Sequence, residues 1–280
     1  MVVEEKQIEA EFFETRGHYS TPPVDEKFMP IESGQKWGSN FTYAWFRLKL
    51  EEADLKGNKY LFCDTGATES LVFIGGKPCG MLDYVEGAEA PRFRTHVYLP
   101  LSDFCGEKEL TVYIEGYYSH KIAGCMPYEK AYYYGLGKDR EPGTFRGIYV
   151  VAIDEDVDAF LDNLYLLDKL YCSVKDEFIK GEIFNLYEEV LKCVQQMPCE
   201  YDYAGGVREA NRLIGAFFSK ETEKREYPYV GIIGHSHLDT AWLWPIDETK
   251  RKAARTVANA VSMMKKFPGY TFVFSSAVHL

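Results

Sequence analysis

The sequence predicts a multidomain chain: an N-terminal antiparallel β-sandwich (residues 1–160), a helical spacer (161–226) and the beginning of an α/β domain (227–280). Three observations predict this order. The first part consists of short runs that alternate apolar and polar residues, as strands with one buried face do. The middle part repeats apolar residues every three or four positions, which is typical of helices. The last part places an apolar run, an amphipathic helix and a second apolar run in succession, which is the order of a βαβ unit.

Six strands are expected in the first part. Turn-forming residues such as Gly75-Gly76 separate the runs, and short strands at this spacing favour an antiparallel sandwich or jelly roll. The expected strands are Tyr43–Leu50, Tyr60–Asp64, Ser70–Ile74, Thr95–Leu99, Glu109–Glu115 and Gly147–Ile153.

Large aromatic residues lie on or beside these strands, at Trp37, Trp45, Phe46 and Phe73. Large aromatic side chains are mostly buried, so we interpret the four as sandwich core. The alternative is a platform that stacks on sugar rings. The sequence itself selects no sugar-binding face.

The segment Tyr117–Thr144 is long and rich in Gly and Tyr. Loops of this length in compact domains are often functional. We favour a solvated or oligomer-interface loop over one that contacts substrate, which leaves a homo-oligomer open.

Helical spacing follows in Asp162–Lys192, and a shorter helix fits Val207–Ser219. Pro198 ends the first of these regions. Both have one apolar face, as expected of a helical spacer that carries no site of its own. The charged run Lys220–Glu226 then marks a boundary near residue 227.

The α/β segment begins with the apolar run Tyr229–Ile233, which is typical of a strand buried on both faces. Pro245 suits the first turn of a helix, and Pro268-Gly269 suit its end. Tyr270–Phe274 predicts the second strand. One βαβ unit cannot close a barrel or a doubly wound sheet, so we expect this domain to be incomplete at Leu280. The apolar face of the helix comprises Ala253, Ala254, Val257, Ala260, Val261 and Met264.

Composition excludes some partners. The formal net charge of −11 argues against nucleic acid and against polybasic attachment to a membrane, since both need a basic face. Met1–Glu14 lacks the features of a signal peptide, and no run has the length of a membrane-spanning helix. The seven cysteines form no CxxC pair, so reduced thiols in a cytoplasmic protein are expected. They are Cys63, Cys79, Cys105, Cys125, Cys172, Cys193 and Cys199.

The chemistry-bearing motif is His235, His237 and Asp239. Alternate side chains of an extended chain point the same way, so the three can converge at the carboxyl end of the first strand. Active sites of α/β domains lie at that end. Imidazole and carboxylate are both zinc ligands, so the motif predicts a metal site. The alternative is a set of helix-capping or core residues.

Spacing alone leaves several metallo-hydrolases open. A metallo-β-lactamase motif would place a His after the Asp, but position 240 is Thr. An amidohydrolase uses an HxH pair at the end of its first barrel strand, and that alternative survives.

The wider motif is more specific. The run from His235 to Pro245, followed by Glu248-Thr249, resembles the opening of the catalytic domain in glycoside hydrolase family 38 α-mannosidases. The similarity is strong after residue 228 and looser before it. It continues through Lys250–Arg255 and Phe267–Tyr270, and upstream at Trp37-Gly38, Trp45–Arg47 and Gly143–Tyr149, where it is similar to the cytosolic and bacterial branch.

The resemblance implies a retaining exo-α-mannosidase with one zinc ion in a seven-stranded α/β barrel, preceded by a galactose-binding-like sandwich. Two zinc ligands of the family fall on His237 and Asp239. His235 would support the site from beside the ligands, and Trp242 would pack beside the sugar. Trp244 is interpreted as structural.

No catalytic carboxylate can be assigned. A retaining glycosidase needs a nucleophile and an acid/base, and the resemblance places the nucleophile and two further ligands downstream of Leu280. We interpret Asp247 and Glu248 as favourable charges at a helix N-terminus.

The leading hypothesis is therefore the N-terminal part of a zinc-dependent retaining exo-α-mannosidase that acts on terminal α-mannosides of oligosaccharides. These 280 residues alone should be inactive and hold zinc weakly or not at all. Two alternatives stay open: a stand-alone carbohydrate-binding or assembly module, and an amidohydrolase-type metal hydrolase.

Overall fold

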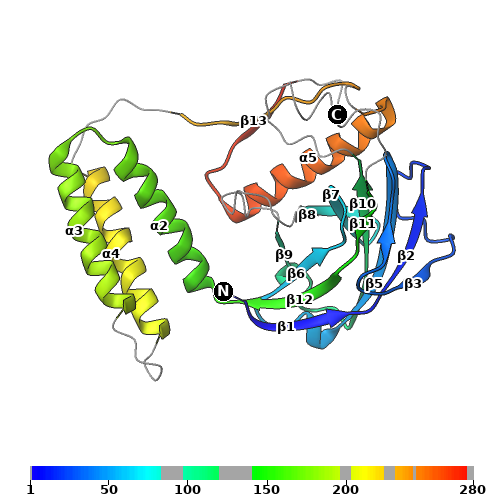
Figure 1. The fold of residues 1–280 in the computed structure, drawn as a ribbon, viewed down its shortest axis with the longest axis horizontal. Coiled ribbons are helices and arrows are strands. Elements are labelled where there is room, and N and C mark those ends of the chain that lie inside the picture. Colours follow the sequence, from blue (N-terminus) through cyan, green and yellow to red (C-terminus); the bar gives the residue numbers. More distant parts are fainter. Residues whose placement is uncertain are drawn as a thin grey trace. The chain divides into compact units, whose positions relative to one another are not determined.

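The computed structural model describes residues 2–82, 97–119, 141–195, 203–223, 231–241 and 244–275. The chain forms two compact units (Figure 1). One unit contains residues 1–4 and 153–230, and the other contains residues 5–152 together with 231–280. The domain boundaries expected near residues 160 and 226 stay a prediction.

Two sheets dominate the second unit. All strand pairs of the six-stranded sheet are antiparallel, and so are the pairs that Lys59–Asp64 of the four-stranded sheet forms with its two neighbours. Five expected strands coincide with β5 (Thr42–Glu51), β6 (Lys59–Asp64), β7 (Glu69–Ile74), β10 (Glu109–Tyr118) and β12 (Gly147–Ile153). The expected Thr95–Leu99 overlaps β9 (Tyr98–Pro100), with residues 95 and 96 outside the described part. The four-stranded sheet has the order β1 (Val2–Ile8), β12 (Gly147–Ile153), β6 (Lys59–Asp64), β9 (Tyr98–Pro100). The six-stranded sheet has the order β3 (Met29–Ile31), β2 (Ala10–Thr15), β5 (Thr42–Glu51), β10 (Glu109–Tyr118), β7 (Glu69–Ile74), β8 (Lys77–Leu82).

Short elements complete this part of the fold. The strands β4 (Lys36–Trp37) and β11 (Gly143–Thr144) pair with each other. Two 3-10 helices, η1 (Glu52–Asp54) and η3 (Ser102–Phe104), precede β6 and β10.

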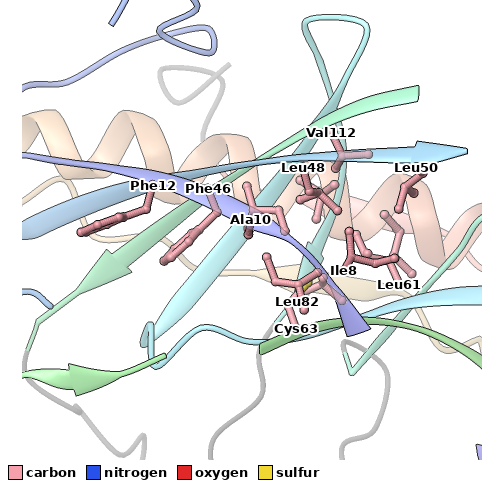
Figure 2. Close-up of a cluster of buried hydrophobic side chains, with 14 of the residues drawn as sticks. Ile8, Ala10, Phe12, Phe46, Leu48, Leu50, Leu61, Cys63, Leu82 and Val112 are labelled. Carbon is pink, nitrogen blue, oxygen red and sulfur yellow. The ribbon is translucent and has the colours of Figure 1, made fainter. Parts of the chain in front are cut away.

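The two sheets share one hydrophobic core, because every second residue of each sheet points toward the other sheet. In β5 these are Ala44, Phe46, Leu48 and Leu50. Figure 2 shows part of this core, in which Leu61 and Cys63 of β6 lie with Ile8, Ala10, Phe12, Phe46, Leu48, Leu50, Leu82 and Val112.

The six-stranded sheet is also buried on its other face. There Trp45 and Phe73 pack with Ala258 of the helix α5 (Ile246–Lys266), which lies across β7, β8 and β10 in Figure 1. Trp37 and Phe46 belong to the core between the sheets. All four aromatics are buried, so their interpretation as core is confirmed, and none offers a ring face to solvent.

The helical unit consists of α2 (Glu155–Ser173), α3 (Glu177–Gln195) and α4 (Tyr203–Glu223), which pack on one another in Figure 1. The region 162–192 with helical spacing is thus two helices. The chain turns extended at Val174, and the Asp176 carboxylate accepts the N–H of Phe178 to begin α3. Within the described residues, no helix is both long and apolar enough to cross a membrane.

The expected βαβ unit is present: β13 (Gly234–Ser236) and β14 (Phe272–Phe274) are parallel, and α5 connects them. The strand begins later than expected, and Ile232 is 89% exposed. Burial of this segment on both faces was thus a wrong expectation for the described residues, because only two strands pair there and no layer covers Ile232. Tyr229 and Val230 lie outside the described residues, as does most of the expected loop Tyr117–Thr144.

Gly66 and Gly57 provide a matched test of close packing in the sandwich. Both have positive φ, +76° and +78°, but a Cβ at Gly66 would lie 2.6 Å from Thr144 O, whereas Gly57 has nothing within 4 Å. We expect Gly57→Ala to lower the free energy of unfolding by about 1–2 kcal/mol through left-handed strain. Gly66→Ala should cost roughly 1–3 kcal/mol more, because the backbones must separate. Urea unfolding measures both, and equal losses would contradict the packing argument.

Candidate metal centre

The HxHxD motif lies at the end of the parallel strand pair. His235 is in β13 opposite Val273 of β14, and His237 and Asp239 follow directly after the strand. The side chain of His237 is 74% exposed and that of Asp239 is 45% exposed. The structure therefore has His237 and Asp239 at the carboxyl end of a strand, as the sequence predicted.

His237 and Asp239 are brought together. Nε2 of His237 lies 3.2 Å from Oδ1 of Asp239. Zinc bonds of roughly 2.0–2.2 Å at a tetrahedral angle separate two such donors by about 3.4 Å. The pair therefore fits two positions of a zinc shell, and without an ion the same atoms can form a hydrogen bond.

The described residues do not complete a metal shell around this pair. Within the described ranges, no group of three or more His, Cys, Asp or Glu is arranged to hold an ion. His235 is exposed, and its supporting role stays a prediction. Trp242 lies outside the described residues, so its contact with a sugar also stays a prediction.

The loop that follows Asp239 is fastened to α5. Ala241 has a φ of +58°, which is uncommon for a residue with a side chain. The hydroxyl of Thr249 accepts the N–H of Ala241 at 3.0 Å and the indole N–H of Trp244 at 3.1 Å. Nζ of Lys252 lies 4.6 Å from the centroid of the Trp244 ring. This agrees with the interpretation of Trp244 as structural.

Thr249→Val should loosen this loop. The substitution keeps the shape but removes the acceptor of two partly buried hydrogen bonds, and a typical hydrogen bond contributes about 0.5–1.5 kcal/mol. We expect the free energy of unfolding to fall by that amount and the Ala241 amide to exchange faster with solvent. Thr249→Ser keeps the hydroxyl and is the control; identical exchange at Ala241 in both variants would exclude the fastening role.

A buried ionic cluster joins α5 to the six-stranded sheet. On the helix face of the sheet, Glu69, Tyr117 and Tyr43 lie directly opposite one another on neighbouring strands. Glu115 projects from the same face of β10, two residues before Tyr117. The helix α5 contributes Glu248, Arg251, Lys252 and Arg255 to the cluster.

Arg255 is the centre of the cluster. Its guanidinium pairs with Glu248, and its Nε lies 2.8 Å from Oε2 of Glu69, an ion pair without hydrogen-bond alignment. Arg255 is 1% exposed and Glu248 is fully buried. The hydroxyl of Tyr43 donates to the other oxygen of Glu248. Arg255 is thus surrounded by carboxylates in an environment without water contact.

The other two cations of the cluster, Arg251 and Lys252, each form hydrogen bonds to one carboxylate. Nε and Nη2 of Arg251 donate to Oε2 of Glu115 at 3.0 and 2.7 Å. Nζ of Lys252 donates to Oε1 of Glu69 at 2.5 Å. Three cations therefore face three carboxylates, Glu69, Glu115 and Glu248, and the formal charges of the cluster cancel.

Burial raises the pKa values of the Glu69 and Glu248 carboxyl groups, whereas the neighbouring cations lower them. Burial raises the pKa of Glu248 although Arg255 opposes this. At Glu69 burial also acts upward, but Arg255 and Lys252 outweigh it and hold the pKa below its ordinary value. Burial, followed by the charge of Glu248, raises the pKa of the Tyr43 hydroxyl. The phenol therefore stays protonated and donates.

Comparison with known proteins finds a family similarity in the segment that contains the motif. Residues 228–280 match the glycosyl hydrolases family 38 N-terminal domain. Over these residues the chain is similar to glycosyl hydrolase family 38. The match contains His235, His237, Asp239 and the whole of α5.

Similar curated proteins are named α-mannosidases. Alpha-mannosidase 2C1 of Mus musculus is 26% identical over 92% of this chain, and that of Homo sapiens is 25% identical over 92%. Alpha-mannosidase of Saccharomyces cerevisiae is 25% identical over 90% of the chain. The chain covers only 24%, 24% and 23% of these three proteins. It thus spans about a quarter of their length.

One similar solved structure is the Lactobacillus rhamnosus β-glucuronidase, at 12% identity. The matched part covers 54% of this chain and 28% of the β-glucuronidase chain, with a TM-score of 0.28. A score this low supports no inference about fold or function.

Sequence reasoning missed the ionic cluster, which includes residues of the helix that follows the HxHxD motif. Asp247 and Glu248 do lie in the first turn of α5, where a carboxylate is favourable, and Asp247 pairs with Lys250 at 3.2 Å. The sequence contained a further signal, because Glu248, Arg251 and Arg255 follow a spacing of three and four that places them on one helix face. That face is buried, as are Ala253 and Ala260 of the expected apolar face, whereas Val257, Val261 and Met264 of the apolar face are exposed.

Proposed function

We propose that this chain is the N-terminal part of a zinc-dependent retaining exo-α-mannosidase that hydrolyses terminal α-mannosides of oligosaccharides. The observation that carries the proposal is the HxHxD pair, His237 and Asp239, whose donor atoms lie 3.2 Å apart within the segment that matches family 38. The α-mannosidase names of the similar proteins support the substrate class.

The finer architecture belongs to the same proposal. We infer that the sandwich is a jelly roll of the galactose-binding-like kind and that the unit β13–α5–β14 begins an α/β barrel. A cytoplasmic location and α-mannoside oligosaccharides as binding partners complete the proposal.

In this proposal His237 and Asp239 hold the zinc ion through Nε2 and a carboxylate oxygen. The ion, when bound, supplies a positive charge that binds sugar hydroxyls and assists distortion of the ring. Trp242 offers an indole face to the apolar face of a pyranose. The nucleophile and the acid/base come from other parts of the protein.

The 280 residues alone should be inactive. Two protein ligands seldom hold zinc, because such sites use three or four. We expect the purified chain to release no detectable product from an aryl α-mannoside and to carry no stoichiometric zinc in elemental analysis. Metal-dependent turnover, or one tightly bound ion per chain, would show that residues within the chain complete the site.

The protein with its full catalytic region tests the function itself. It should hydrolyse an aryl α-mannoside, lose this activity on chelation and regain it with zinc. An aryl β-mannoside is the matched control, because it has the same aglycone and sugar but the opposite anomeric configuration. Hydrolysis that is insensitive to chelation, or equal rates on both anomers, would reject the proposal.

A further inference from the structure

We propose that Glu69, a residue of the sandwich, is a positioning residue for the loop that carries the His237–Asp239 pair. This inference rests on the proposed function for its link to the metal site. Its basis is a continuous set of contacts that leads from β7 through α5 to Trp244, the last described aromatic of that loop.

The first contact is between Glu69 and Lys252. Nζ of Lys252 lies 2.5 Å from Oε1 of Glu69, and the two side chains are 14% and 24% exposed. A lysine ammonium group is carried on a flexible four-carbon stem. Its position is therefore determined largely by the carboxylate to which it binds. Glu69 therefore fixes Nζ of Lys252 over the helix face of the sheet.

The second contact is between Lys252 and the loop. The same Nζ lies 4.6 Å from the centroid of the Trp244 ring, within the range of a cation–π interaction. The indole N–H of that ring donates to Thr249, which also holds Ala241. Lys252 thus contacts the sandwich and the loop with one charged group.

Glu69 also fixes α5 against the sheet. Its second oxygen pairs with Arg255, whose other end pairs with Glu248, the residue before Thr249. Each residue of an α-helix advances the chain by about 1.5 Å and turns it by about 100°. A helix displaced by one residue would break these pairs and leave buried charges without partners, so the cluster specifies one register. Apolar contacts alone would specify it less sharply.

The fluorine spectrum of tryptophan tests the positioning directly. The chain contains four tryptophans, so 5-fluorotryptophan labelling gives four resonances, which Trp→Phe variants assign. Glu69→Gln keeps the shape of the side chain and removes its charge. We expect it to shift or broaden the Trp244 resonance and to leave unchanged the resonance of Trp37, which lies in the core between the two sheets.

Glu109→Gln is the matched control. Glu109 begins β10 in the same sheet and pairs with Lys49 at 3.4 Å, but both side chains are exposed. This control should leave every fluorine resonance in place. Lys252→Arg keeps the charge and should preserve the Trp244 resonance, whereas Lys252→Met should displace it.

Zinc titration of the protein with its full catalytic region supplies the link to the site. Glu69→Gln should weaken zinc binding by about tenfold, at the lower end of what lost supporting contacts cause, and Glu109→Gln should not. An unmoved Trp244 resonance in Glu69→Gln would overturn the inference, and so would a moved resonance with unchanged zinc affinity. Failure of the unaltered protein to bind zinc would instead reject the proposed function, while the fluorine spectrum would still decide whether Glu69 positions the loop.

Discussion

Arg255→Met is expected to lower the free energy of unfolding by about 3–5 kcal/mol, the cost of removing one partner from a buried ionic group. Arg255 is 1% exposed and pairs with Glu248 and Glu69. Without it, Arg251 and Lys252 are the remaining cations opposite three carboxylates, so one buried negative charge is left unbalanced. Desolvation of that charge, and not the loss of attraction alone, produces the large effect.

Lys265→Met on the same helix is the control for this prediction. Lys265 pairs with Asp103 at 2.7 Å, but both side chains are well exposed, and such pairs contribute about 0–1 kcal/mol. The double variant Arg255→Met/Glu248→Gln removes the unbalanced negative charge, so it should recover part of the lost free energy of unfolding. Urea unfolding followed by tryptophan fluorescence measures all three variants, and a loss for Arg255→Met no larger than for Lys265→Met would contradict the account of the cluster.

Asp239→Ala and His237→Ala should each abolish α-mannosidase activity in the protein with its full catalytic region. Each removes one of two donors that lie 3.2 Å apart, and the remaining ligands then hold zinc poorly. His235→Ala should be milder, with a loss of about 10–100-fold in activity or metal affinity, as is usual for residues that support a ligand. Equal losses at His235 and Asp239 would show that His235 is itself a ligand.

The strands could be predicted where local alternation and turn residues agreed, as in β6 and β12. The strand β8 was missed because Lys77–Leu82 contains Pro78 and Gly80, which carry no strand pattern. The central strand β5 alternates poorly because it is buried on both faces, against the other sheet at Phe46 and against α5 at Trp45. That second burial depends on a helix more than two hundred residues away in the sequence, which no local pattern reports.

The candidate site could be predicted in part, because one of its features is local in the sequence and the other joins distant residues. The spacing of two residues puts the side chains of His237 and Asp239 within reach of each other. The support of the loop involves Glu69 and Lys252, which are 183 residues apart and meet only through the packing of α5 on the sheet. Helix periodicity predicted an apolar face of α5, of which Ala253 and Ala260 are buried. Because the sheet also presents carboxylates, the charged residues Arg251 and Arg255 are buried beside them, which the periodicity did not indicate.

The most direct test of the central claim is the zinc content of His237→Ala and Trp242→Ala in the protein with its full catalytic region, measured with the α-mannosidase rate of the same preparations. His237 supplies a donor atom, so its variant should lose both zinc and activity. Trp242 is proposed to pack on the sugar, so its variant should keep the ion and lose sugar binding. Full zinc in His237→Ala together with lost zinc in Trp242→Ala would contradict the assignment of the metal ligands.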